Sequence, residues 1–152
     1  NFHTGYNLEC LHTYIEATGD HQFDEQLERG LRYFKKHFFD PDGAPKYYHN
    51  SRYPIDIQSA SQAIDTLAVF SDRDPECFAL ACKVADWTIR NLQAPQGHFY
   101  YRHLGWKKVK APMIHWGQAT MYKALVTLLG KFPGTTAAHQ SSATTAGVVT
   151  AQ

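Results

Sequence analysis

Helical segments joined alternately by short turns and by long connections constrain the possible folds of this chain more than any other feature. Apolar residues recur at intervals of three or four, and this periodicity predicts amphipathic helices. Asp74, Pro75 and Glu76 mark the start of the fourth helix, because they combine an N-cap, a first-turn proline and an acid near the positive helix end. The predicted helices cover residues 4–17, 21–38, 58–71, 75–92 and 115–130.

The two long connections, residues 39–57 and 93–114, have about twenty residues each, and connections of this length are often functional. Their sequences are alike, which indicates an internal repeat with a period of about 55 residues. The tyrosine pairs in them predict a short β-hairpin in each connection. Because antiparallel helical hairpins bring all long connections to one end, we expect any function there. The matching segments are Asp42-Gly43 with Gln96-Gly97, Tyr47-Tyr48-His49 with Tyr100-Tyr101-Arg102, and Gln62-Ala63 with Gln118-Ala119.

The composition predicts one domain and excludes several classes of protein. The chain has 152 residues, a formal net charge of +1 and 43% hydrophobic residues. It therefore has enough apolar side chains for a core, but no general positive field with which to bind nucleic acid. No uncharged apolar run is long enough to span a membrane. We expect a folded domain over residues 1–131 and a low-complexity, disordered tail over residues 132–152, where Asp, Glu, Lys and Arg are absent.

The three cysteines predict neither a disulfide framework nor a metal site. Cys10, Cys77 and Cys82 are an odd number, and their spacing matches no ligand motif, so we expect buried, reduced thiols. The sequence has no secretory segment, no glycine-rich phosphate loop and no paired-histidine metal motif. These observations favour a cytoplasmic protein without a cofactor or a bound metal. Because the chain begins at Asn1 rather than Met, a signal upstream stays an open alternative.

Three segments carry a resemblance to a known architecture: Phe2 to Glu9, the Gly97-x-x-Tyr-Tyr-Arg strand, and His115 to Ala119. They resemble the six-hairpin (α/α)6 toroid proteins of bacterial polysaccharide biosynthesis clusters. N-acylglucosamine 2-epimerases, unsaturated glucuronyl hydrolases, and uronate lyases and epimerases share that architecture. The resemblance covers residues 1–131 and implies an all-α fold of helical hairpins. Since about two and a half hairpins are present where a ring needs six, the chain looks like the C-terminal part of a toroid, and we expect self-association through exposed apolar surface.

In a toroid, the helices entered from the long connections line the central pocket, and this implies three candidate acid/base residues. His3 and His115 precede Gly5 and Gly117 at equivalent helix entries, where an imidazole can accept or donate a proton. The alternative is that each histidine closes a helix N-terminus by hydrogen bonding. Asp56 lies just before the third helix, and capping of that helix competes with catalysis as its role.

Seven further residues are predicted to contact substrate. The flat faces of the aromatic candidates are suited to the C–H faces of sugars. Arg102 is the predicted bidentate anchor for a carboxylate. With Lys107, Lys108 and Lys110 it forms a positive patch without acids, for which a solvated loop is the alternative. The candidates are Tyr6, Glu9, Tyr53, Gln58, Arg102, Trp116 and Gln118.

The resemblance and these residues together predict a carbohydrate-active protein of bacterial polysaccharide metabolism. The expected substrate is an acidic or N-acetylated saccharide or polysaccharide. The expected chemistry is epimerisation, elimination or hydrolysis by acid/base catalysis. Two alternatives stay open: a non-catalytic helical-repeat module that binds glycan or protein through the same aromatic end, and an inactive truncated fragment. Nucleic acid is not an expected partner.

Overall fold

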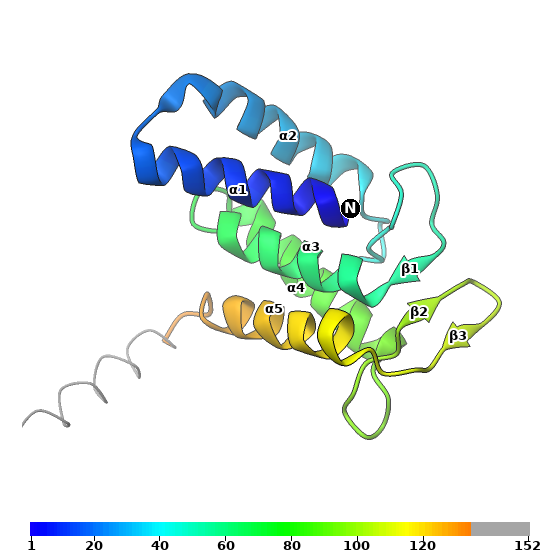
Figure 1. Ribbon diagram of the computed structural model, residues 1–152. Helices are drawn as coiled ribbons and strands as arrows, with labels where there is room; N and C mark the ends of the chain where they lie inside the picture. Colours follow the sequence, from blue (N-terminus) through cyan, green and yellow to red (C-terminus); the bar gives the residue numbers. More distant parts are fainter. Residues whose placement is uncertain (135–152) are drawn as a thin grey trace, which may run out of the picture.

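The computed structural model describes residues 1–134 and is mainly helical, with a small antiparallel sheet (Figure 1). The predicted helices are confirmed to within a few residues at each end. The predicted tail lies outside the described residues except for residues 132–134. The elements are α1 (Phe2–Thr18), a 3₁₀ turn (His21–Phe23), α2 (Asp24–His37), β1 (Ile55–Asp56), α3 (Ile57–Phe70), α4 (Pro75–Leu92), β2 (Arg102–His103), β3 (Lys108–Val109), a π-helix (Ile114–Ala119) and α5 (Thr120–Leu129).

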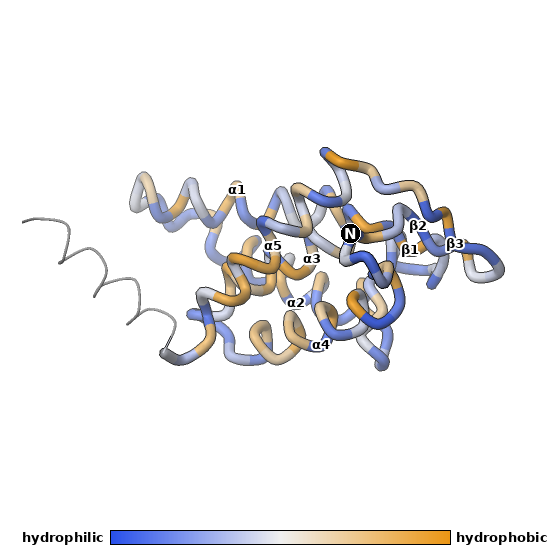
Figure 2. Tube along the Cα trace, turned by 90° about the horizontal axis from the view of Figure 1, so that it is seen from below, coloured by the Kyte–Doolittle hydropathy of each residue, from blue (hydrophilic) through white to orange (hydrophobic). Residues whose placement is uncertain are grey.

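The helices form two layers. Helices α1, α3 and α5 lie side by side and run in the same direction, and α2 and α4 lie behind them (Figures 1 and 2). Helix α3 packs against α1, α4 and α5, and twelve of its fourteen residues are buried. A helix that is covered on all sides is the centre of a core. Any ligand site on the layer of α1, α3 and α5 therefore lies next to α3, the helix that packing holds in place from several sides.

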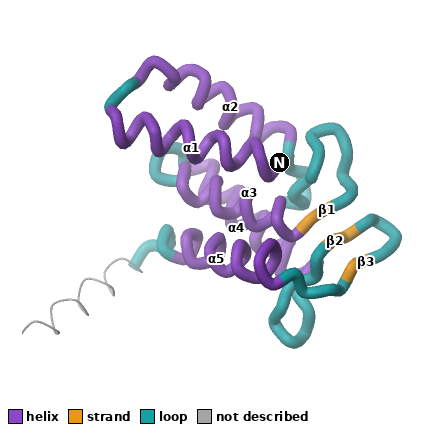
Figure 3. Tube along the Cα trace, in the orientation of Figure 1, coloured by secondary structure: helices purple, strands orange, loops and turns teal. Residues whose placement is uncertain are grey.

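Local signals explain where the helices begin and end. The side chain of Asp74 accepts a hydrogen bond from the Glu76 amide and caps α4, and Pro75 is the first residue of that helix. Gly19 ends α1 in the left-handed conformation, with φ of 68°, which costs a glycine little. Short turns close the hairpins α1–α2 and α3–α4 at the end opposite the long connections (Figure 3).

Two glycines let the outer members of the layer approach α3 closely. A Cβ atom on Gly5 would lie 2.6 Å from the Thr66 hydroxyl oxygen, and one on Gly117 would lie 3.2 Å from Ile57 Cγ2. Glycine is required where two helices come this near. Gly5 lies in the first turn of α1 and contacts the middle of α3, whereas Gly117 lies in the π-helix before α5 and contacts the start of α3.

The internal repeat is visible in the backbone of the long connections. In the first, the Gly43 amide donates to the Asp40 carbonyl, and Phe39 pairs with Pro45. In the second, the corresponding Gly97 amide donates to Ala94, and residues 93 and 99 pair in the same way. The φ angles of the two glycines are 94° and 93°. Equivalent bonds at equivalent positions show that the first parts of the two connections, residues 39–45 and 93–99, share one local structure.

The two connections differ in their β structure, which corrects the expectation of one short hairpin in each. Of the two, the second connection forms a hairpin, from β2 and β3, directly after its tyrosine pair. After its Phe39–Pro45 bridge, the first contributes one more bridge, between Tyr48 and Ser51, and then strand β1. Strand β1 pairs antiparallel with β2, so one three-stranded sheet joins both connections. The sheet ties the two connections together at the entry to α3.

Candidate functional site

The long connections and the start of α1 gather at one end of the molecule (Figure 3). At this end a cavity of about 440 Å³ opens between α1, α3, the second connection and the π-helix. We call it the mouth cavity. Side chains from four separate segments line it, and Phe, Tyr and Trp each contribute one of these side chains. The lining residues are Phe2, His3, Gln58, Tyr101, Met113 and Trp116.

Two polar side chains of the mouth cavity are available to a ligand. Among the described residues, neither the His3 imidazole nor the Gln58 amide makes a side-chain hydrogen bond. His3 is exposed and contacts the neighbouring Phe2 ring, at 4.7 Å between centroids. Trp116 is 56% exposed, although an indole normally buries most of its surface. The cavity therefore combines unpaired polar groups with the solvent-exposed indole of Trp116.

The π-helix presents Trp116 to this cavity. The amide of Gln118 donates to the Met113 carbonyl, which is the wider hydrogen-bond spacing of a π-helix, and the Gly117 amide donates to the same oxygen. Single π turns inside helices occur often at functional sites. His115 lies in this turn and is exposed, but it does not line the mouth cavity. The structure thus brings His3 and Trp116 to one cavity and leaves His115 outside it.

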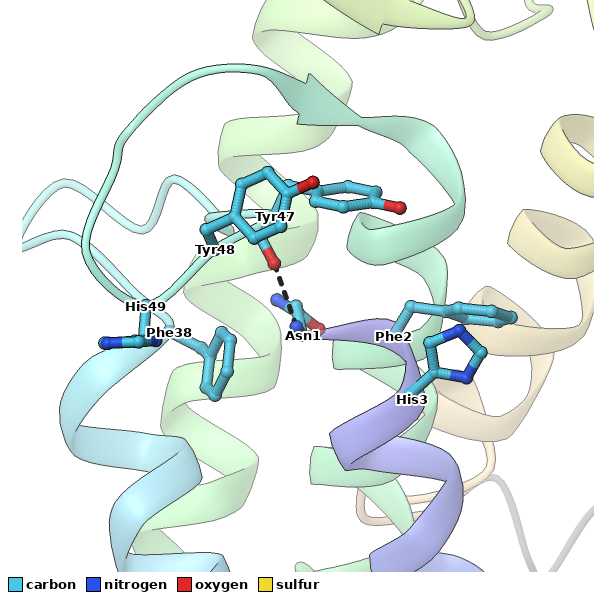
Figure 4. A pocket seen from close by; sticks show the side chains of 7 residues that line it. All are labelled: Asn1, Phe2, His3, Phe38, Tyr47, Tyr48 and His49. Atoms are coloured by element: carbon cyan, nitrogen blue, oxygen red, sulfur yellow. Dashed lines mark hydrogen bonds between the residues drawn. The ribbon is translucent and has the colours of Figure 1, made fainter.

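A second cavity, of about 170 Å³, adjoins the mouth cavity (Figure 4). Phe2 and His3 line both cavities, so they form the wall between them. The close-up shows the rings of Tyr47 and Tyr48 above Asn1, whose amino group donates to the Tyr47 carbonyl at 2.9 Å. Phe38, His49 and the two tyrosines come from the end of α2 and the first connection, so that connection encloses the start of α1.

A narrow polar cleft of about 30 Å³ continues from this end between α1, α3 and α5. Tyr6 lines the cleft, and Glu9 lies one turn further along α1. The Gln62 amide donates to Glu9 Oε1 at 2.7 Å, and the Thr66 hydroxyl donates to the same oxygen. Burial raises the pKa of Glu9, against the hydrogen bond from Thr66, which lowers it. On the other side of the cleft, Lys123 forms an ion pair with the buried Asp65.

Asp56 and Arg102 bind each other outside the cavities. The Asp56 side chain accepts a hydrogen bond of 2.9 Å from the backbone amide of Gln58 and so caps α3. Its other oxygen accepts hydrogen bonds from Nε and Nη2 of Arg102, at 2.9 and 2.8 Å. Arg102 also donates to the Tyr101 hydroxyl and lies over that ring, with 4.7 Å between the guanidinium carbon and the centroid. In the structure, Asp56 caps α3. The guanidinium of Arg102, which was predicted to anchor a substrate, instead links β2 to the start of α3.

Two further predicted residues support the connections and do not line the mouth cavity. The Gln118 side chain accepts from the Phe99 amide and donates to the Phe99 carbonyl, both at 2.8 Å, so it holds the second connection against the π-helix. Tyr53 packs against the His103 ring and under Gly105, whose Cβ position would lie 3.1 Å from the tyrosine ring. Burial and the nearby Lys108 lower the pKa of His103.

Several residues that line these sites were not among the predicted site residues, and four of them show what was missed. Phe2 and Met113 line the mouth cavity, and Asp65 and Lys123 line the polar cleft. A signal for Asp65 was present, because Gln58, Gln62 and Asp65 recur at helical spacing and so share one face of α3. A charged residue in a helix otherwise buried all round has to find a partner, and Lys123 supplies it.

Comparisons of this chain with protein-family models, with curated proteins and with solved structures found no match. Within residues 1–134, no three His, Cys, Asp or Glu side chains are grouped so that they could hold a metal ion. None of the described helices combines the length and apolar character needed to cross a bilayer. The chemistry of the mouth cavity is thus the basis for a functional proposal.

Proposed function

We propose that this chain binds a saccharide in the mouth cavity and acts on it by acid/base chemistry, as part of the bacterial polysaccharide metabolism that its resemblance implies. One observation carries the proposal: an exposed indole, a free imidazole and a free amide face one cavity of about 440 Å³. Aromatic faces bind the C–H faces of a sugar, and polar groups bind its hydroxyls. Acidic and N-acetylated sugars are the candidate substrates.

His3 is the proposed proton-transfer residue. It is the one imidazole lining the mouth cavity, and an imidazole can both accept and donate a proton. Its ring makes no hydrogen bond with the described residues, so a ligand C–H or O–H meets an unoccupied nitrogen. Trp116 and Gln58 then position the sugar against it. The polar cleft with Glu9 and Tyr6 lies further along the same helical layer and extends the surface available to a longer substrate.

The larger architecture we propose is a ring of helical hairpins, of which the described hairpins are a part. Two observations support it. The long connections repeat their hydrogen bonds at equivalent positions, as successive units of an array do. Helix α5 exposes apolar side chains, with Tyr122 74% and Val126 50% exposed, where a further hairpin would cover them. On this proposal the isolated chain self-associates, and light scattering at increasing concentration measures it.

Isotope exchange tests the proposed chemistry where it removes a proton from a sugar carbon, as epimerisation and elimination do. Each of a panel of N-acetylhexosamines and uronic acids is incubated with the protein in D₂O, and ¹H NMR follows loss of a sugar C–H signal. We expect exchange with at least one sugar, its loss in His3→Gln, and its retention in the matched variant His115→Gln. Exchange that persists in His3→Gln would remove His3 from the proposed role.

A binding module without catalysis is the second candidate, and one observation favours it. Of the three predicted acid/base residues, only His3 lines the mouth cavity, because Asp56 is paired with Arg102 and His115 lies outside. Calorimetry with the same sugars separates the two functions. Binding that Trp116→Ala weakens about tenfold or more, without isotope exchange in the wild-type chain, favours a binding module over epimerisation or elimination. Tyr122→Ala on α5 is the matched control, because that ring is exposed but lines no described cavity.

A further inference from the structure

The β2–β3 hairpin presents an exposed tryptophan at its tip. The Leu104 amide donates to the Lys107 carbonyl at 2.8 Å and closes the turn. Gly105 adopts φ of 94° and packs on the Tyr53 ring, so the turn is both shaped by glycine and supported from below. Trp106 next to it is 82% exposed. A well-defined turn that keeps an indole exposed to solvent is an expected contact point for a binding partner.

The hairpin is also positively charged, and its charges are not neutralised. Between residues 87 and 134 the sequence contains no Asp or Glu. Among the described residues, Lys107, Lys108 and Lys110 form no ion pair, whereas Arg102 at the base is paired with Asp56. The Lys107 ammonium lies 5.9 Å from the Trp106 ring centroid and the Lys110 ammonium 5.6 Å from that of Tyr100. The lysines therefore lie beside aromatic faces and remain available to an anion.

The hairpin rises from the rim of the mouth cavity. The chain enters β2 directly after Tyr101 and leaves β3 toward Met113, and both of these residues line the cavity. The exposed segment from Lys110 to Trp116 continues from the hairpin into the cavity wall. A chain-like ligand with one unit in the cavity would therefore run along the hairpin with its neighbouring units.

We infer that the β2–β3 hairpin is an arm that binds the carboxylates of an acidic polysaccharide, one sugar unit of which occupies the mouth cavity. This inference rests on the proposed function and narrows its substrate to the acidic class. Lys107, Lys108 and Lys110 supply the positive charge, and Trp106 supplies a flat face for a sugar ring. The hairpin lysines take the anchoring role that the sequence predicted for Arg102.

Charge favours an acidic glycan over nucleic acid. The whole chain has a formal net charge of only +1, and the arm offers three lysines. Nucleic-acid binding proteins neutralise many closely spaced phosphates, and their affinity comes largely from that number. A uronic acid polymer carries one carboxylate on each sugar and also offers apolar C–H faces. Three ammonium groups interleaved with aromatic rings match that lower charge density.

The test uses the full chain and three probes: a galacturonic acid hexasaccharide, the same hexasaccharide as its methyl ester, and hexameric oligothymidylate. The first variant carries Lys107→Gln, Lys108→Gln and Lys110→Gln. The matched control carries Arg29→Gln, Arg32→Gln and Lys36→Gln on α2, where the side chains are exposed and form no ion pair among the described residues. Both variants lower the net charge by three. Calorimetry at about 20 mM and about 500 mM salt gives the affinities.

We expect the hairpin variant to lose about twentyfold in affinity for the acidic hexasaccharide at low salt, as three exposed ion pairs would give. The α2 variant should stay within about twofold of wild type, and the methyl ester should bind as weakly to wild type as the acid binds to the hairpin variant. Equal loss in both variants, equal binding of acid and ester, or tighter binding of oligothymidylate would each overturn the inference.

One further variant separates failure of the arm from failure of the proposed function. Trp116→Ala removes the indole of the mouth cavity and leaves the hairpin lysines in place. If both Trp116→Ala and the hairpin variant weaken binding of the acid, the arm and the cavity act on one ligand, as inferred. If only the Trp116→Ala variant weakens it, the cavity binds sugar and the arm is refuted. If only the hairpin variant weakens it, saccharide binding in the cavity is refuted, and with it the inference that rests on it.

Discussion

The Asp56–Arg102 pair allows the sharpest prediction about the fold. Asp56 has a side chain only 3% exposed, caps α3 and accepts two hydrogen bonds from Arg102, whose side chain is 30% exposed. Replacing Asp56 by Ala removes the cap and leaves the guanidinium without its partner. It therefore removes the side-chain link between β2 and the start of α3, the helix at the centre of the core.

The magnitude follows from these contacts. Loss of an N-cap costs about 1 kcal/mol. Loss of hydrogen bonds to a charged group costs about 2 kcal/mol, at the lower end of the range because Arg102 can rehydrate. Asp56→Ala should thus lower the free energy of unfolding by about 3 kcal/mol, and the melting temperature by about 10 °C for a domain of this size. Asp56→Asn keeps a capping oxygen and should cost about half as much.

Urea unfolding followed by circular dichroism measures these differences. Arg102→Gln leaves a buried carboxylate without its ion-pair partner, so it should also cost about 3 kcal/mol. The double variant of Asp56→Asn and Arg102→Gln should cost less than the sum of the single changes, because the two residues interact directly. A melting temperature within about 2 °C of wild type for Asp56→Ala would refute the structural role of this residue.

Three further predictions concern titratable groups. Burial raises the pKa of Cys77 to about 12, so it should not react with a thiol reagent at pH 8 in the folded chain, whereas the exposed Cys10 should react at once. Burial raises the pKa of the Glu9 carboxyl above its ordinary value of 4.5. The protonated carboxyl therefore contributes stability below pH 4.5, and this contribution is lost as the pH rises through the pKa of the folded state. Glu9→Gln should remove this loss. The hydrogen bond from Arg52 holds the pKa of Asp42 at about 2. The ionised Asp42 therefore stabilises the fold above pH 3.8, and this contribution is lost as the pH falls toward 2. Arg52→Gln should reduce that loss.

Each of these predictions has a result that contradicts it. Labelling of Cys77 at the rate of Cys10 would mean that the thiol is not buried. Urea midpoints measured from pH 4 to 8 should converge for wild type and Glu9→Gln at the acid end, and parallel curves would contradict the raised pKa. For Arg52→Gln, an acid-unfolding curve superimposable on that of wild type would show that the ion pair with Asp42 contributes nothing.

Most of the helical fold could be predicted because its signals are local. The fourth predicted helix, 75–92, matches α4 because cap, proline and apolar face agree. The repeat was readable because Gly43 and Gly97 stand at the same place in both connections, and glycine is what the positive φ there requires. The π-helix over Ile114–Ala119 was not predictable, since it depends on how Gly117 packs against Ile57 on another helix.

The arrangement of the candidate residues could be predicted only in part, and the differences have a common physical cause. His3, Gln58 and Trp116 were placed correctly at the long-connection end and meet in one cavity. The roles of Arg102 and Asp56 depend on the register of β1 against β2, in which these two residues stand opposite each other. That register is a long-range pairing, and neither residue's own neighbours in sequence indicate it. Spacing along a chain identifies a helix face, but it does not show which charges neutralise each other across elements.

The central claim is that a saccharide binds in the mouth cavity, and chemical-shift mapping tests it most directly. ¹H–¹⁵N spectra of the labelled chain are recorded during titration with the galacturonic acid hexasaccharide and with an N-acetylhexosamine. The largest shifts should fall on the amides of His3, Gln58 and Tyr101 and on the Trp116 indole. Shifts confined to α2, to α4 or to the outer face of α5, with these signals unchanged at saturation, would contradict the claim.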